Sequence, residues 1–494
     1  MRLILCLTLF LFTTGAHATT YYVSNTGNNR YDGTSPSASW QTLQRVQIAA
    51  NSGLMKPGDK ILFKRGDSFS GTLTWSSIFG NKAPSGTKDA PITFGAYGTG
   101  ARPVFQYHSD FEKDPTKKVL FMVAGVNYII FDGLDITDQR FPKEDKVSPA
   151  YCAIAFNFGS YGDATSNHCI VRNCIMSNIG MGIVLVGDSN TVDSCRFTDL
   201  KNVRNTFGNN FPENDDDYGA NGVTITGNDN LITHNFFSGN WAESYDYGFS
   251  GGALESFGSS SRNRIMYNTI IDCNGVMEIG SGSGGMADNN LIANNVLINN
   301  GGLTWVNISG TFAIQASNIQ YFNNTIIDIE NRYKDKALFL FNGKPEAETV
   351  FNIQNNVFYL SSGINVTTDK VDTKKFIHQN NVYQLTNGSV ANLKLSPSEL
   401  ISTQPVFQNT GSKDPLQWNY QLTPAGRGKK AGSAVPFTGS ITDSHLTGSV
   451  VPVTPELAAR LESAFYAVLF QQDVKKARWL MQLFRVLSAG LVIG

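Results

Sequence analysis

The sequence carries little charge, and this shortage already excludes several classes of protein. Only 16% of its 494 residues are charged, and the formal net charge is -1. Such a balance gives no electrostatic reason to expect binding to nucleic acid or to an anionic membrane. The apolar run from Leu3 to Phe12 is too short to span a bilayer. We therefore expect no integral membrane segment once the N-terminal segment has been removed.

Cysteine is scarce as well. Removal of Cys6 with the N-terminal segment leaves an odd number, which argues against a full disulfide framework. Cys174 and Cys195 hold the same place in neighbouring repeats, which favours two small buried residues stacked on each other. A disulfide between coils is the alternative. The sequence has no CxxC pair and its six histidines are scattered, so no zinc site is expected.

The first 18 residues have the layout of a secretory signal peptide. Met1-Arg2 supplies a basic start, the run from Leu3 to Phe12 supplies an apolar core, and Ala16-His17-Ala18 supplies a small-x-small exit. We expect cleavage near Ala18 and a secreted protein that is extracellular, periplasmic or held at the cell surface.

Asparagine recurs through the middle of the chain and indicates an internal repeat. Glycine numbers 47 and apolar residues make up 41%, which suits a turn-rich β protein. From about Leu120, one register places these residues at corresponding positions: Gly133, Asn173, Ser194, Asn235, Asn268, Asn295, Asn324, Asn356 and Asn381. Stacked asparagines can exchange side-chain amide hydrogen bonds with the coils above and below. Uneven repeat lengths with a constant asparagine register predict a parallel β-helix.

The two ends differ from this repeat. Residues 19–104 are predicted to form an N-terminal cap and the first coils, with a capping helix between Trp40 and Ala50. The parallel β-helix is assigned to residues 105–435, a linker to 436–454 and a helical tail to 455–494. That tail could cap the last coil, bind a partner helix or lie on a membrane surface.

The repeat resembles the right-handed parallel β-helix proteins of the pectin-lyase-like superfamily. The resemblance rests on the entry segment from Tyr21 to Pro36, the strand beginning Gly58-Asp59-Lys60-Ile61, and pairs such as Asn294-Asn295 and Asn323-Asn324. It implies an all-β, right-handed solenoid over roughly residues 20–435. Members include secreted polysaccharide lyases and glycoside hydrolases, but also adhesins and tail-spike proteins, so the resemblance specifies architecture better than activity.

Four short apolar runs that begin with glycine predict a functional stripe. They are Gly222-Val-Thr-Ile-Thr, Gly251-Gly-Ala-Leu-Glu-Ser, Gly275-Val-Met-Glu-Ile and Gly302-Leu-Thr-Trp-Val. Because strand side chains alternate in and out, the apolar residues take the interior and the polar ones face outward. The predicted outer stripe consists of Thr226, Glu255, Glu278 and Trp305, with the two glutamates close together.

A second repeat places acids and aromatic residues beside this stripe. Asp217-Tyr218-Gly219 and Asp246-Tyr247-Gly248 each precede a strand glycine by the same spacing. Matching loops on adjacent coils would bring Asp217 and Asp246 to one rim. We therefore expect up to four carboxylates around a groove, with four aromatic residues as sugar platforms: Trp305, Tyr218, Tyr247 and Trp241.

Paired carboxylates suit glycosidic hydrolysis, which needs one acid to protonate the leaving oxygen and one carboxylate as nucleophile or base. Glu255 and Glu278 are the preferred pair, in either order, and Asp246 and Asp217 are supporting or alternative catalytic groups. The substrate predicted is a polysaccharide, with no cofactor required, and the sequence leaves the oligomeric state open.

Other interpretations stay open. Asp217 and Asp246 could hold Ca²⁺, as in a calcium-dependent polysaccharide lyase. A lyase also needs a basic residue, and the nearest along the chain are Lys201, Arg204 and Arg262. The stripe could also be solvated surface, or belong to a carbohydrate-binding or adhesive protein that performs no chemistry.

Overall fold

The computed structural model describes residues 18–426, except 79, 108–118, 139–150, 158–163, 204–216, 283, 334–336, 362–363, 368–370, 387–389 and 392–393. The signal segment before residue 18, the linker 436–454 and the helical tail 455–494 lie outside the described residues. The predictions made for them stay predictions.

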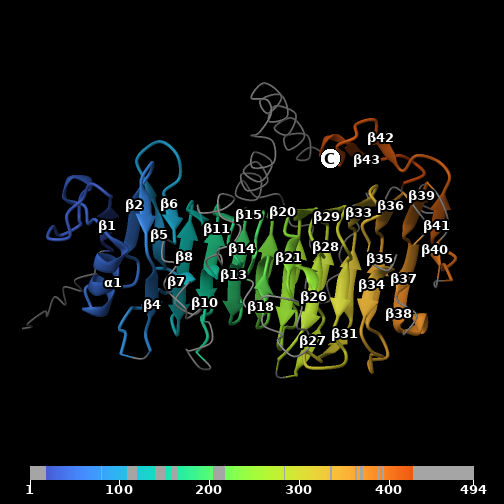
Figure 1. The fold of residues 1–494 in the computed structure, drawn as a ribbon, viewed down its shortest axis with the longest axis horizontal. Helices are drawn as coiled ribbons and strands as arrows, with labels where there is room; N and C mark the ends of the chain where they lie inside the picture. Colours follow the sequence, from blue (N-terminus) through green and yellow to red (C-terminus); the bar gives the residue numbers. More distant parts are fainter. Residues whose placement is uncertain are drawn as a thin grey trace, which may run out of the picture.

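Three long parallel sheets run the length of the molecule (Figure 1), because each coil contributes one strand to each sheet. The first sheet contains, in order, β1 (Thr20–Val23), β2 (Lys60–Lys64), β5 (Ile92–Tyr97), β8 (Ile129–Asp132), β11 (Ile170–Arg172), β14 (Thr191–Asp193), β19 (Leu231–Thr233), β24 (Arg264–Met266), β28 (Leu291–Ala293), β32 (Ile319–Phe322), β35 (Phe351–Gln354) and β38 (Phe376–Gln379).

The second sheet carries the candidate site. Its strands are β4 (Leu73–Ser76), β7 (Val119–Ala124), β10 (Cys152–Phe156), β13 (Met181–Val186), β18 (Asn221–Thr226), β23 (Gly252–Phe257), β26 (Met277–Gly280), β30 (Thr304–Val306), β34 (Ala337–Phe341), β37 (Ile364–Thr367) and β40 (Val390–Ala391).

The third sheet completes each coil. It contains β3 (Ser68–Ser70), β6 (Val104–Gln106), β9 (Asp135–Thr137), β12 (Ile175–Ser177), β15 (Arg196–Thr198), β20 (Phe236–Ser238), β25 (Thr269–Ile271), β29 (Val296–Ile298), β33 (Thr325–Asp328), β36 (Val357–Leu360), β39 (Val382–Leu385) and β41 (Leu400–Ser402). The predicted all-β parallel β-helix is thus confirmed, and the pectin-lyase-like resemblance holds for its architecture.

Short strand pairs extend from the coils. The antiparallel pairs are β16 (Asn202–Val203) with β17 (Tyr218–Gly219), β21 (Ala242–Ser244) with β22 (Gly248–Ser250), and β42 (Phe407–Asn409) with β43 (Asn419–Leu422). β27 (Met286–Asp288) and β31 (Gln315–Ser317) pair in parallel. Single turns of 3-10 helix span Pro36–Ala38, Thr373–Lys375 and Pro415–Gln417.

An asparagine ladder joins successive coils, as predicted. Asn235 donates its backbone N–H and its side-chain amide to Oδ1 of Asn268, at 2.9 and 3.0 Å, and Asn268 does the same to Asn295. The ladder continues through Asn324, Asn356 and Asn381. Each side-chain amide therefore supplies a hydrogen-bond partner to buried backbone groups that water cannot reach.

The predicted register was wrong by one residue at its N-terminal end. The column of Asn235 continues into Cys195 and Cys174, whereas Gly133, Asn173 and Ser194 occupy the preceding corner, where all three have positive φ. Glycine and asparagine suit such a corner, and asparagine also occupies the ladder position, so residue type alone did not separate the two columns. Cys174 and Cys195 are buried free thiols in adjacent coils, which confirms stacking rather than a disulfide.

The N-terminal helix is present as α1 (Leu43–Asn51), near its predicted bounds. Thr42 caps it by accepting a hydrogen bond from the N–H of Arg45, and Leu43, Val46, Ala49 and Ala50 join the main core. Its role as a cap stays a prediction. Within the part of the chain that the structure describes, no helix has the length and apolarity to cross a membrane.

Candidate active site

The stripe on the second sheet brings the two predicted glutamates together. Glu255 of β23 is the direct partner of Glu278 in β26, and Glu278 is the partner of Trp305 in β30. Adjacent strands lie about 4.8 Å apart, so the two carboxylates extend from neighbouring backbones on the same outer face. The prediction that Glu255 and Glu278 are near neighbours facing outward is confirmed.

The prediction was wrong for the first member of the stripe. Thr224, and not Thr226, is the partner of Glu255, because Asn221 is aligned with Gly252. The prediction counted from Gly251 in one coil and from Gly222 in the previous one. Counting from Gly252 gives the same three-residue offset to Glu255 that Gly275 has to Glu278 and Gly302 to Trp305.

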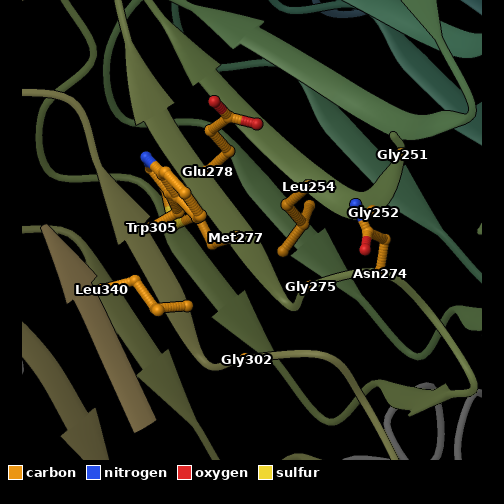
Figure 2. Close-up of a pocket in the computed structure, with 10 residues that line it drawn as sticks. All are labelled: Gly251, Gly252, Leu254, Asn274, Gly275, Met277, Glu278, Gly302, Trp305 and Leu340. Carbon is orange, nitrogen blue, oxygen red and sulfur yellow. The ribbon is translucent and has the colours of Figure 1, made fainter. Parts of the chain in front are cut away.

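A row of glycines opens a pocket beside the stripe (Figure 2). Gly252, Gly275 and Gly302 lie on successive coils and line it, together with Asn274, Glu278, Trp305 and Leu340. A Cβ built on Gly275 meets no atom within 4 Å among the described residues, and its backbone does not require positive φ. At Gly275 the absence of a side chain thus leaves room for a ligand, and the backbone conformation there does not demand glycine.

Glu255 is a partly buried carboxylate that is held in its place by two donors. Asn221 Nδ2 and Thr224 Oγ1 both donate to its Oε2, at 2.9 and 3.0 Å. Burial, followed by the charge of Glu278, raises the pKa of Glu255 from 4.5 to about 7, and the two hydrogen bonds oppose this rise. Because both donors point at Oε2, the proton of the neutral acid belongs on Oε1.

Glu278 is the exposed member of the pair, and an amide relay fixes its position. Asn307 Nδ2 donates to Glu278 Oε1 at 2.9 Å. Oδ1 of Asn307 in turn accepts from the indole Nε1 of Trp305 and from Nδ2 of Asn342, both at 3.0 Å. Asn307 therefore fixes the carboxylate of Glu278 and the ring of Trp305 relative to each other.

Asp217 and Asp246 also come together, but inside the protein. The backbone N–H of Asp217 donates to Asp246 Oδ2 at 2.8 Å, and Asp217 Oδ2 accepts from Ser244 Oγ at 2.7 Å and from Tyr245 N at 2.6 Å. Both are buried, at 7% and 4% exposure. The predicted placement on an open rim was wrong, because the carboxylates instead satisfy donors in the loops that carry β17 and β21–β22.

The four predicted platforms separate into one at the pocket and three around it. Trp305 lines the pocket and is 37% exposed. Tyr218 and Tyr247 are exposed on β17 and beside β22 and do not line it. Trp241 lies close to Gly301, the neighbour of a pocket glycine, with the guanidinium of Arg332 5.6 Å from its ring centroid. Their roles as sugar platforms stay predictions.

Several residues of the site were missed from the sequence. Asn221, Thr224 and Asn307 hold the glutamates, and the buried Tyr151 has its pKa raised by burial, with smaller contributions that include Tyr218 and Glu255. The correct register would have indicated Thr224, which occupies the stripe position one coil earlier, and Asn221, which is aligned with Gly252. No periodic signal marks Tyr151, since it precedes its strand.

The residues considered for a lyase are placed only in part by the described residues. Arg262 pairs with Asp229 at 2.8 Å, next to the first sheet, and Arg204 lies outside the described residues. Lys201 lies in the segment that pairs with the loop before β18. Among the described residues, no group of three or more His, Cys, Asp or Glu side chains is placed to hold a metal ion.

The molecule is thus a parallel β-helix with a carboxylate pair beside a pocket on one sheet. No protein-family model matches the chain. A lacto-N-biosidase from Bifidobacterium longum subsp. longum is 32% identical over 146 residues, which is 26% of this chain and 9% of that protein. The chain therefore spans only a small part of this curated relative.

Solved structures with a related shape are distant in sequence. A GH136 lacto-N-biosidase from Eubacterium ramulus has a TM-score of 0.43 and 14% identity, over 78% of this chain and 66% of that one. Pectate lyase Pel9A has a TM-score of 0.41 and 16% identity, over 82% and 89% of the two chains. A tailspike protein of E. coli bacteriophage HK620, in complex with a pentasaccharide, has a TM-score of 0.47 and 13% identity, over 74% and 65%.

Proposed function

We propose that this protein is a secreted glycoside hydrolase that cleaves a polysaccharide with Glu255 and Glu278. The observation that carries the proposal is the direct pairing of the two glutamates, with the pKa of Glu255 raised to about 7. A neutral carboxylic acid beside an ionised one is the combination that glycosidic hydrolysis requires. The name of the curated relative, a lacto-N-biosidase, supports action on a glycan.

The different surroundings of the two glutamates assign their roles. Glu255, which is protonated near neutral pH, donates the proton on Oε1 to the glycosidic oxygen as the bond to the anomeric carbon breaks. Glu278, exposed and fixed by Asn307, attacks the anomeric carbon and forms a glycosyl-enzyme. Glu255, now ionised, then takes a proton from the water that hydrolyses this intermediate.

Retention of configuration is part of this proposal, and the pairing of adjacent strands supports it. Carboxyl groups about 5 Å apart belong to retaining enzymes, whereas inverting enzymes leave a wider gap for water. Glu255 and Glu278 project from strands about 4.8 Å apart. Asp246 with Glu278 would be the wider pair, but Asp246 is buried and accepts a hydrogen bond from the backbone of Asp217.

A polysaccharide panel tests the proposal. We expect new reducing ends without the ultraviolet absorbance of unsaturated products, and we expect Glu278→Gln and Glu255→Gln to remove this activity. Unsaturated products would instead indicate a lyase, and binding without any product would indicate a carbohydrate-binding protein. Full activity in both variants would show that the site lies elsewhere.

A further inference from the structure

The stripe of Thr224, Glu255, Glu278 and Trp305 belongs to a longer row of outward-facing positions on the second sheet, which runs from Ala155 to Leu340. This outer row is exposed to solvent over only a short distance, which limits what can bind. On the N-terminal side of Glu255, Ala155, Val184 and Thr224 are buried, at 0%, 5% and 7% exposure. They belong to the same row as the glutamates, but the row is covered there. The covering includes Tyr151 and Val203, which join Ala155 and Val184 in a separate apolar cluster.

The row is covered again on the other side of the pocket. Trp305 is 37% exposed, but Leu340, its partner in the next coil, is 4% exposed and lines the pocket. The fully open part therefore covers the coils of Glu278 and Trp305, roughly 10 Å along the axis of the solenoid. Burial of the row on both sides of this open part is unfavourable for a glycan that continues along the axis.

Protein also covers the C-terminal end of β26, outside the pocket lining. Residues 307–314 fold back over Gly280, since Ser281 N donates to the carbonyl oxygen of Phe312 at 3.0 Å and Ile314 N donates to that of Asn307 at 2.9 Å. The remaining opening lies at the glycine row of Gly252, Gly275 and Gly302, which Figure 2 shows beside the strand starts.

The lining of the pocket also disfavours a negatively charged sugar. Of the residues that line it, Glu278 alone is charged, and the rest are glycines, Asn274, Trp305, Leu254, Met277 and Leu340. A sugar carboxylate placed there would face the charge of Glu278 without a compensating cation among these residues, which is unfavourable in a partly desolvated site. A neutral sugar ring can instead stack on Trp305.

From these features we infer that the pocket takes the end of a neutral glycan chain and releases short products, so that cleavage is exo-acting. The inference rests on the proposed hydrolase function. It goes beyond that function because paired carboxylates serve internal and terminal cleavage equally well, whereas a row that is buried on both sides of Glu278 and Trp305 favours a chain end.

Two forms of the same substrate test the mode of attack. Neutral polysaccharides are supplied both in solution and as dyed, cross-linked granules, alongside aryl glycosides of single neutral sugars and of a uronic acid. We expect short products from the first time point, with viscosity falling slowly, little dye released and the neutral aryl glycosides cleaved. Rapid loss of viscosity with dye release would overturn terminal attack, and comparable cleavage of the uronide would overturn neutrality.

Failure of the hydrolase proposal would look different. In that case neither the soluble polysaccharides nor the aryl glycosides would yield products, and wild type would equal Glu278→Gln. Cleavage with rapid dye release would retain the hydrolase function and reject only the inference. The two outcomes are therefore read from separate measurements on the same protein.

Variants of the walls sharpen the test. Gly275→Val adds a side chain where the pocket is open, so we expect KM for the chain end to rise about tenfold or more. Gly95→Ala is a control in β5, because its new methyl meets the flexible Leu62 side chain at 3.2 Å and makes ordinary contacts at 3.8 Å with Asp132 O and Thr93 Cγ2. Leu340→Ala lowers a wall, and we expect a larger share of internal cleavage. An unchanged KM in Gly275→Val would contradict the assignment of the pocket.

Discussion

Two acid pairs on adjacent coils have similar sequence patterns and different surroundings. Asp217 directly precedes β17 and Asp246 lies in the turn between β21 and β22, and both accept hydrogen bonds while almost fully buried. Glu255 and Glu278 lie on the open face of a sheet, and burial together with mutual repulsion raises the pKa of one of them. Repetition thus marks both pairs, whereas donors and exposure separate a structural pair from a reactive one.

The largest expected effect separates the two pairs by activity. Glu278→Gln and Glu255→Gln should each lower kcat by about 10²–10⁴-fold, because each removes a group that acts in the transition state. Asp217→Asn and Asp246→Asn are the matched controls and should retain kcat within about tenfold in the folded fraction. Steady-state kinetics with the best polysaccharide from the panel measure both. Equal losses in the two pairs would erase the distinction.

Stability should separate the pairs in the opposite direction. Asp217→Ala leaves buried donors of Ser244 and Tyr245 without their acceptor, which we expect to cost about 2–4 kcal/mol of unfolding free energy. Glu278→Ala, at an exposed position, should cost less than about 1 kcal/mol. Chemical denaturation followed by circular dichroism measures both. A larger loss for Glu278→Ala would show that the aspartates are not the structural pair.

The raised pKa of Glu255 should also appear in the dependence of stability on pH. The folded protein holds this proton more tightly than the unfolded chain does, so its contribution to stability is present below pH 4.5 and is lost as pH rises towards 7. Glu255→Gln has no such charge to bury. Relative to wild type, this variant should gain at most roughly 3 kcal/mol between pH 4.5 and pH 7 or above. A constant difference between the two proteins across that range would contradict the shift.

Activity should decline above the same pKa, and the position of the decline should respond to Thr224. The alkaline limb of kcat/KM reports loss of the proton on Glu255, near pH 7 in wild type. Thr224→Val removes a hydrogen bond that favours the ionised form, so the limb should move to higher pH by up to about one unit. Thr226→Val, two residues along β18 from Thr224, is the control and should leave the limb in place. A shift of the limb to lower pH would contradict the conclusion that the hydrogen bond from Thr224 favours the ionised form of Glu255.

The smallest effect concerns the amide relay. Asn307→Ala removes the donor to Glu278 and the acceptor for Trp305, which should lower kcat several-fold while leaving the alkaline limb in place. Asn307→Asp keeps the acceptor but puts a charge beside Glu278, so it should be the more harmful change. Kinetics at several pH values distinguish the two variants. Equal activity in both would remove the positioning role of Asn307.

The repeating part of the molecule could be predicted from the sequence, because its determinants are local and periodic. Alternating apolar residues fix which side of each strand faces inward, and stacked asparagines fix the order of the coils. From these alone, Glu255 and Glu278 were placed together on an outer face. The errors at Thr226, Gly133, Asn173 and Ser194 are shifts of register by one or two residues.

The tertiary structure alone decided what lies around the stripe. Burial of Asp217 and Asp246, the contact of Tyr151 with its surroundings and the closure over Leu340 depend on segments far apart along the chain. These loops do not repeat regularly along the chain, so no sequence pattern predicts how deeply their residues are buried. Exposure and hydrogen-bond donors set whether a carboxylate is structural or reactive, and both are properties of the assembled fold rather than of the repeat.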